Sequence, residues 1–318
     1  MPLPGITIPT IDISPYLTSP DSPTGLATIT QVATACRTSG FFQLTGHGIP
    51  PTLQKQVFAG SRKLFALPQT EKEKIKSVIG GRGYEVLGGQ TLQYGAKPDL
   101  KEGFFVGPEI ADDKEEYEAY QHPNKWPDTR LIPDEQLRIP VLEYRKQLCD
   151  LALVIMQILA QGLPGGRKDM FDDFCADPLA VVRLLHYPPQ RDIEDETLFG
   201  AGAHTDFGAI TLLLQDETGG LQVRKPETEG DAWIDIPPNP DAYVVNVGDM
   251  LDMWTKGMYK SNVHRVINRS GGDRYSVPFF FDGNLEYIIK PLDGSEVEGS
   301  GMTVRQFMDE RYARSYPK

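Results

Sequence analysis

Two histidines and one aspartate in the second half of the chain have the residue types of a metal site. His204 and Asp206 are separated by one residue, and His264 follows much later. On a strand, side chains two residues apart project from the same face, so the first two can reach one metal ion. Two imidazoles and a carboxylate bind ferrous iron on one face of its octahedron and leave three positions open. The pattern therefore predicts a non-haem iron site that a distant strand completes with His264.

A fixed cation follows the second histidine. Arg274 and Ser276 are two residues apart, so they share a face if this segment is a strand. A guanidinium group is planar and can bind a carboxylate through two parallel hydrogen bonds. The pair predicts an anchor for a carboxylate beside the metal.

Each of these signals has an ordinary structural interpretation when taken alone. The chain has 5 histidines and 44 acidic residues, so about one His-x-Asp is expected from composition. A single histidine such as His264 is more often a hydrogen-bonded structural residue, and an Arg-x-Ser pair often lies on a surface. Agreement in order, spacing and flanking sequence is what makes the combination specific.

The flanking segments extend over nearly the whole chain. Those around the candidate site are residues 203–208 (AHTDFG), 210–216 (ITLLLQD), 219–223 (GGLQV), 246–250 (NVGDM), 254–257 (WTKG), 259–261 (YKS), 263–266 (VHRV) and 274–281 (RYSVPFFF). Those near the amino terminus are 40–44 (GFFQL), 46–49 (GHGI) and 64–68 (LFALP). Together they resemble the isopenicillin N synthase-like branch of the 2-oxoglutarate- and iron(II)-dependent dioxygenases.

This resemblance implies both the metal and the co-substrates. The metal would be Fe(2+), and the co-substrates would be 2-oxoglutarate and O2. The expected iron ligands are His204, Asp206 and His264. Arg274 and Ser276 would bind the distal carboxylate of 2-oxoglutarate.

One segment departs from the family pattern. By resemblance, Tyr187 is a further donor to 2-oxoglutarate. The family commonly reads Asn-Tyr-Tyr-Pro here, whereas residues 185–188 of this chain read LHYP. Leu185 stands at the position of the asparagine, which puts the finer geometry of the co-substrate in doubt. His186 is expected to point away from its two neighbours.

The resemblance also implies a reaction class. The enzyme would hydroxylate, desaturate or rearrange a small organic metabolite, in specialised metabolism, with release of succinate and CO2. Phe207 and Phe281 are hypothesised walls of the substrate pocket, although both could equally be ordinary core residues.

Three alternatives stay open at this point. Some members of this branch keep similar motifs without using 2-oxoglutarate, so the chain could be an iron(II) oxidase of that kind. A non-catalytic small-molecule binder could keep the same fold. Two histidines and an aspartate are also compatible with a zinc hydrolase, although no general base is evident.

Composition limits the class of partner. The chain has 318 residues, 40% of them hydrophobic, and a net charge of −12. It has no basic cluster that could follow a phosphate backbone and no apolar run of roughly 18 residues. Cys36, Cys149 and Cys175 are odd in number and widely spaced, which favours free thiols in a reducing compartment. We expect a cytoplasmic enzyme with a small-molecule substrate and no nucleic-acid, membrane or obligate protein partner.

The expected elements change character along the chain. The first half predicts strands at residues 6–13 and 41–44, helices at 25–38, 50–67 and 134–163, and loops with short strands at 79–133. The second half predicts short strands at 181–185, 209–214, 221–223, 243–247, 263–268 and 275–281, and a last helix at 303–314.

The expected fold is mixed α/β of the mainly-β kind. By resemblance it is a double-stranded β-helix, or jelly roll, with flanking amino-terminal helices and a carboxy-terminal helix. Residues 1–318 would form a single catalytic unit, with an amino-terminal dioxygenase region at 1–130 and the iron- and 2-oxoglutarate-binding core at 179–285.

Overall fold

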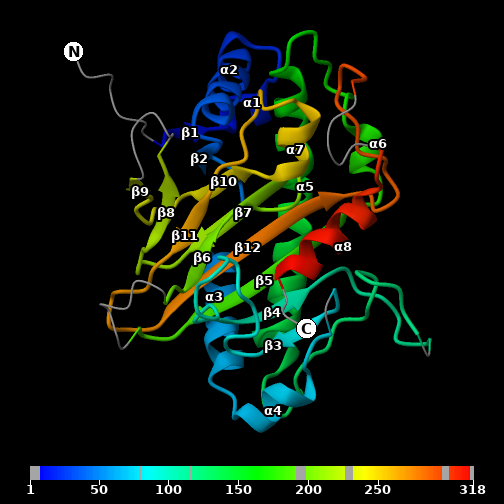
Figure 1. Ribbon diagram of the computed structural model, residues 1–318. Coiled ribbons are helices and arrows are strands. Elements are labelled where there is room, and N and C mark those ends of the chain that lie inside the picture. The colour runs from blue at the N-terminus through cyan, green and yellow to red at the C-terminus, as the bar shows by residue number, and fades with distance from the viewer. Residues whose placement is uncertain are drawn as a thin grey trace.

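Two β-sheets organise the chain in the computed structural model, which describes residues 8–78, 80–114, 116–190, 198–225, 232–295 and 301–315 (Figure 1). The larger sheet has eight strands, in the order β1 (Thr10–Asp12), β2 (Phe41–Thr45), β10 (Tyr243–Val247), β7 (Ile210–Gln215), β12 (Arg274–Gly283), β5 (Leu179–Tyr187), β4 (Glu102–Val106) and β3 (Gly83–Glu85). The smaller sheet has four strands, in the order β6 (Ala201–His204), β11 (His264–Val266), β8 (Leu221–Arg224) and β9 (Trp233–Asp235).

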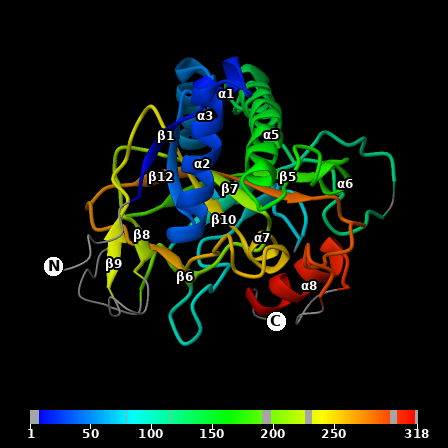
Figure 2. The ribbon, with the colours of Figure 1, turned by 90° about the horizontal axis from the view of Figure 1, so that it is seen from above.

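The helices flank the larger sheet. They are α1 (Ser14–Thr18), α2 (Pro23–Thr38), α3 (Pro51–Phe65), α4 (Gln69–Lys74), α5 (Arg138–Gln161), α6 (Asp172–Cys175), α7 (Asp249–Trp254) and α8 (Val304–Ser315), with a short 3-10 helix at Asp134–Gln136. Figure 2 shows α1, α2, α3 and α5 on one side of this sheet and α8 on the other. This is the jelly roll with flanking helices that the sequence predicts.

Helix α5 shows why the elements pack in this way. Leu148, Leu151, Ile155, Ile158 and Leu159 recur at helical spacing and are all buried. They belong to the main hydrophobic core, together with residues of the larger sheet. The predicted helix at 134–163 is therefore confirmed, with its first turn replaced by the 3-10 helix. Within the described residues, no helix has the length and apolar content needed to span a bilayer.

The amino-terminal part of the chain extends the larger sheet at both ends. β2 pairs with β10 and β1 with β2 at one end, and β4 pairs with β5 and β3 with β4 at the other. The strand expected at residues 6–13 is shorter in the structure, and residues 6 and 7 lie outside the described part. Short elements such as α4, α7 and β9 were not predicted, because segments of three to six residues carry little periodicity. The strand expected to carry both His204 and Asp206 ends at His204.

The two faces of strand β12 contact different parts of the interior. Val277, Phe279 and Phe281 belong to the main core that contains α5. The alternate residues line pockets on the other face, and they are Arg274, Ser276, Pro278, Phe280 and Asp282. This strand therefore supplies one wall along the whole length of the candidate site.

Candidate active site

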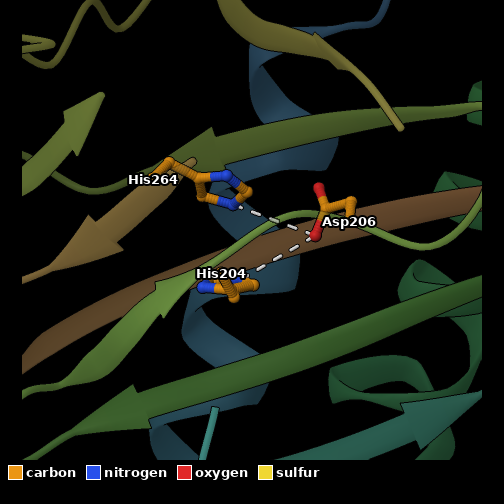
Figure 3. Close-up of side chains that lie close together, drawn as sticks. All are labelled: His204, Asp206 and His264. Carbon is orange, nitrogen blue, oxygen red and sulfur yellow. Dashed lines mark ion pairs between the residues drawn. The ribbon is translucent and has the colours of Figure 1, made fainter. Parts of the chain in front are cut away.

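His204, Asp206 and His264 come together on the smaller sheet (Figure 3). His204 ends β6 and is the direct cross-strand partner of His264, which begins β11. The Nε2 atoms of His204 and His264 lie 3.9 and 3.8 Å from Oδ1 of Asp206. One ligand atom from each residue lies within 4.8 Å of the others. The convergence that the sequence predicts is therefore present.

Backbone carbonyl groups orient both imidazole rings. The Nδ1 atom of His204 is 2.7 Å from the carbonyl oxygen of Gly202, and that of His264 is 3.3 Å from the carbonyl oxygen of Asn262. In each ring Nδ1–H donates to the carbonyl, which leaves the Nε2 lone pair directed toward Asp206. Such outer contacts fix the tautomer of a metal-binding histidine.

The Asp206 carboxylate is held by two donors that the sequence analysis missed. Thr211 Oγ1 and Asn246 Nδ2 donate to its Oδ2 atom at 2.6 and 2.7 Å. The other oxygen, Oδ1, faces the two histidines. Thr211 and Asn246 are polar residues inside the apolar strands β7 and β10, and that contrast was a usable signal.

The pKa shifts of His204 and Asp206 favour the protonation states that bind a cation. Burial and the neighbouring His264 lower the pKa of His204, so its ring is neutral at physiological pH. Burial raises the pKa of Asp206, but the imidazoles and the hydrogen bonds from Thr211 and Asn246 outweigh it and leave the pKa below its usual value. A neutral imidazole and an ionised carboxylate are the forms that bind a metal.

The donor set fits a divalent transition metal. Bonds from such a metal to histidine nitrogen or carboxylate oxygen are about 2.0–2.2 Å long, so two ligand atoms of one ion lie up to about 4.2 Å apart. The two separations from Asp206 Oδ1, 3.9 and 3.8 Å, fall within that limit. Two imidazoles and one carboxylate with open positions are the donor set of non-haem ferrous sites.

A pocket beside the three residues contains an incompletely paired guanidinium group. Arg274 is fully buried and lines this pocket together with His204 and Asp206. Its Nε atom donates to the carbonyl oxygen of Gly219 at 2.6 Å, and its Nη2 atom donates to Gln215 Oε1 at 3.2 Å. Its Nη1 atom is buried and has no hydrogen-bond partner among the described residues. A buried donor without a partner is costly, so this atom fits an anionic guest.

The other predicted co-substrate residues surround this guanidinium. Ser276 Oγ lies 3.5 Å from the hydroxyl of Tyr187, and the Arg274 guanidinium lies 4.7 Å from the centre of the Tyr187 ring. Leu185 is buried in the same pocket and supplies no polar atom where the family asparagine was expected. His186 points the other way, as expected, and contacts Glu102 and Asp273.

Lys101 is a second cation in this pocket that the sequence did not reveal. Its side chain is buried, pairs with Asp99 and lines the pocket together with Leu185. Asp99 also accepts a hydrogen bond from the backbone N–H of Gly202 at 2.9 Å, next to the metal-site strand. Burial lowers the pKa of Lys101 to about 8, and Asp99 opposes that shift. No motif marks this lysine, because its position depends on a loop ahead of β4.

A second pocket adjoins the first at His204 and Asp206. Phe207 lines it. The hypothesis for Phe281 is wrong, since that side chain is fully buried on the opposite face of β12, with its ring 6.0 Å from that of Phe174. The adjacent Phe280 lines the pocket instead. The remaining lining residues that the sequence analysis did not single out are Gln90, Leu92, Phe105, Arg183, Thr205, Asp282, Met308 and Tyr312.

Two charged residues of this second pocket differ in their surroundings. Arg183 pairs with Glu85, donates to Gln90 Oε1 at 3.2 Å and stacks 4.6 Å from the centre of the Phe105 ring. Asp282 is 5% exposed. Burial and the nearby Asp206 raise the pKa of Asp282 to about 7.

Comparison with known proteins identifies the family. Residues 8–129 match the family of the amino-terminal region of the non-haem dioxygenase in morphine synthesis, and residues 178–283 match the 2OG-Fe(II) oxygenase superfamily. The chain is 46% identical to the 2-oxoglutarate-dependent dioxygenase citB of Monascus ruber, covering 97% of this chain and 95% of that protein. The chain belongs to the 2-oxoglutarate- and iron(II)-dependent dioxygenases.

Other relatives of this dioxygenase include solved structures with bound ligands. Clavatol oxidase claD of Penicillium crustosum is 40% identical over 98% of each chain. The structure of Neurospora crassa T7H in complex with alpha-KG and thymine has a TM-score of 0.83 and 29% identity, covering 99% of this chain and 98% of that one. The structure of JOX2 with 2OG, Fe and JA has a TM-score of 0.77 and 29% identity, covering 96% and 85%. The dioxygenase is thus an oxidoreductase whose cofactor is Fe(2+) and whose co-substrate is 2-oxoglutarate.

Proposed function

We propose that His204, Asp206 and His264 hold the iron of this dioxygenase and that Arg274, Ser276 and Tyr187 hold its 2-oxoglutarate. The observation that carries the proposal is the unpaired Nη1 atom of Arg274, buried in a pocket that also contains His204 and Asp206. A dicarboxylate whose far end meets this guanidinium has its keto-acid end directed toward the three ligands.

Each residue has a distinct task in this assignment. Arg274 neutralises and orients the distal carboxylate, and the hydroxyls of Ser276 and Tyr187 donate to it. Thr211 and Asn246 hold the Asp206 carboxylate in one orientation, so that Oδ1 faces the metal position. When bound, iron and 2-oxoglutarate react with O2 to give succinate and CO2 while one substrate C–H bond is oxidised.

The substrate is a small organic metabolite that enters the pocket lined by Phe207 and Phe280. Phe207 forms part of its wall, and the aromatic lining keeps water away from the reacting group. Hydroxylation, desaturation and rearrangement all begin with removal of a hydrogen from the substrate, and the substrate decides among them. Specialised metabolism is the setting we propose, since clavatol oxidase is among the similar proteins.

We further propose that residues 1–318 act as one catalytic unit in the cytoplasm, without nucleic-acid, membrane or obligate protein partners. The net charge of −12 disfavours binding to polyanions. Cys36, Cys149 and Cys175 are free thiols, which suits a reducing compartment.

The test is co-substrate turnover with a panel of candidate metabolites. The purified protein is given Fe(2+), 2-oxoglutarate and O2, and both succinate and oxidised product are measured. We expect succinate in proportion to product, and loss of both when zinc replaces iron. Product without any need for 2-oxoglutarate would identify an oxidase of the other kind, and activity retained with zinc would identify a hydrolase.

A further inference from the structure

The Asp282 carboxyl group faces the second pocket without a partner in the protein. Its side chain is buried, with 5% exposure, and it lines the pocket together with Phe207 and Phe280. No group among the described residues donates a hydrogen bond to it or forms an ion pair with it. Buried carboxyl groups in native proteins nearly always have such partners, in the protein or in bound water, so this one is available to a molecule in the pocket.

The backbone holds Asp282 at this place. It lies eight residues after Arg274 on β12, and an even separation places both on the same face of the strand. The two residues line opposite ends of the candidate site. A Cβ atom at Gly208 would lie 2.1 Å from its Oδ1 atom. Glycine at 208, two residues after Asp206, therefore leaves room for the carboxyl group beside the metal position.

The two nearby guanidinium groups do not pair with this carboxyl group. Arg82 lies close enough to lower the pKa of Asp282 but forms no ion pair with it, since its Nη2 atom donates to the carbonyl oxygen of Tyr120. Arg183 pairs with Glu85. Burial and Asp206 are the influences that raise the pKa of Asp282. In either protonation state the carboxyl group can accept a hydrogen bond.

The rest of the pocket is lined by apolar and polar side chains. The apolar ones are four aromatic residues, a leucine and a methionine, namely Phe105, Phe207, Phe280, Tyr312, Leu92 and Met308, and the polar ones away from the metal position are Gln90, Arg183 and Thr205. Aromatic walls bind rings well, because ring faces and edges pack closely against one another. Aromatic and aliphatic walls with a few placed polar groups are the usual form of a site that binds a small molecule in one orientation.

We propose that the substrate is a small unsaturated ring compound that presents a hydroxyl or N–H group to Asp282. The inference rests on the proposed function, because it takes this pocket as the substrate site. Asp282 acts as a specificity and positioning residue: it fixes which edge of the ring is held at this end of the pocket. A substrate carboxylate at this edge is disfavoured, since an ionised Asp282 would repel it.

The first test compares stability without any ligand. Asp282→Leu replaces the unpaired carboxyl group with an apolar side chain of the same branched shape, and Asp282→Asn removes its charge at nearly the same volume. We expect both variants to melt higher than the parent protein, by about 2 °C or more, since the desolvation cost is relieved. The matched control is Asp216→Asn, because Asp216 accepts hydrogen bonds from the backbone N–H groups of Tyr275 at 2.6 Å and Thr218 at 2.9 Å. That control should melt lower.

The second test measures recognition directly. The protein with Fe(2+) and 2-oxoglutarate is kept free of O2, and binding of meta-cresol, its methyl ether and meta-toluate is measured by calorimetry and saturation-transfer NMR. We expect meta-cresol to bind at least about tenfold more tightly than the other two. Asp282→Leu should abolish that preference, and Asp282→Asn should keep part of it, because an amide oxygen still accepts a hydrogen bond.

The outcomes separate the two proposals. Lower melting temperatures for both Asp282 variants would make the residue a structural one and overturn the inference. A tenfold preference that survives in Asp282→Leu would overturn it as well, and failure of every ring probe to bind would overturn the ring class. The stability comparison needs neither iron nor 2-oxoglutarate, so it remains valid if the calorimetry finds no 2-oxoglutarate binding and the proposed function fails.

Discussion

Thr211 and Asn246 are direct cross-strand partners on β7 and β10, and both donate to the same oxygen of Asp206. The larger sheet thereby fixes a carboxylate that belongs to the turn after β6 of the smaller sheet. Two donors on one oxygen leave the other oxygen for a cation. The cluster of His204, Asp206 and His264 is thus held by both sheets, although the three residues themselves belong to the smaller sheet and its adjoining turn.

This relationship predicts the effect of removing either donor. Thr211→Val or Asn246→Leu should weaken Fe(2+) binding by about 10- to 100-fold, the usual effect of losing an outer contact to a metal ligand. Anaerobic titration with Fe(2+) measures the dissociation constant. Thr34→Val is the control. The Thr34 hydroxyl donates to a backbone carbonyl oxygen within α2, far from the site. Unchanged Fe(2+) affinity in both site variants would exclude the role assigned to this pair.

Replacing Arg274 should weaken the binding of 2-oxoglutarate but not the binding of iron. Arg274→Ala removes the only buried guanidinium among the described residues that has an unpaired Nη1 atom, so 2-oxoglutarate affinity should fall by about 10- to 100-fold. Fe(2+) affinity should change little, because none of the ligand contacts involves this side chain. Both constants are measured by anaerobic calorimetry.

Arg274→Lys sharpens that experiment, since it keeps the charge but loses the planar pair of donors. Its affinity for 2-oxoglutarate should be intermediate between those of the parent protein and Arg274→Ala. Arg305→Ala is the surface control, because Arg305 pairs with Glu118 and Glu286. Lost iron with an unchanged requirement for 2-oxoglutarate would contradict the assignment of Arg274.

The sequence predicts the metal triad and the carboxylate anchor because their spacing is local or their flanks are distinctive. The sequence prediction for the pocket wall is wrong by one residue, since it names Phe281 and the structure has Phe280 there. Side chains alternate along a strand, so the face shared by Arg274 and Ser276 continues to Phe280 and Asp282 and excludes Phe281. Alternation alone would have corrected that choice.

Other residues could not be found in this way. Lys101 reaches the pocket that contains Arg274 from the chain just before β4, and Tyr312 reaches the second pocket from α8. Their positions depend on how distant segments pack, which no spacing within the sequence reveals. Thr211 and Asn246 are intermediate. The sequence shows that each is a polar residue in an apolar strand, but it does not show which group each one contacts.

His186 should make the stability of the protein depend on pH. Burial lowers its pKa, but hydrogen bonds to Glu102 and Asp273 outweigh this effect and raise the pKa above the ordinary value of 6.5. The stabilisation is therefore fully present below about pH 6.5 and is lost as pH rises through the folded-state pKa. His186→Gln should remove that dependence. Denaturant unfolding at intervals from about pH 5.5 to 8.5 measures it.

The control for this experiment is His122→Gln, because the pKa of His122 is lowered, chiefly by burial. That variant should keep the decline in stability above pH 6.5. If His186→Gln and the parent protein lose the same stability over this range, the ion pairs of His186 do not contribute to it.

Helix α8 should loosen when one ion pair is removed. Arg311 on α8 contacts Asp249 Oδ2 at 3.0 Å, and Asp249 also accepts from Thr205 at 3.2 Å and Ser261 at 2.8 Å. The backbone N–H of Asp249 donates to the carbonyl oxygen of Asp206 at 2.8 Å, so the ion pair connects α8 to the metal-site turn. Arg311→Ala should speed amide hydrogen exchange in α8, while global stability changes by only about 0–1 kcal/mol.

Arg314→Ala is the matched variant, because Arg314 lies on the same helix and its pair with Glu310, at 3.9 Å, is exposed. It should leave exchange in α8 nearly unchanged. Hydrogen-exchange mass spectrometry on both variants therefore separates a general loss of arginine from loss of the contact with Asp249. Equal exchange in the two variants would mean that Phe307 and Met308, which are buried beneath the helix, hold α8 without the ion pair.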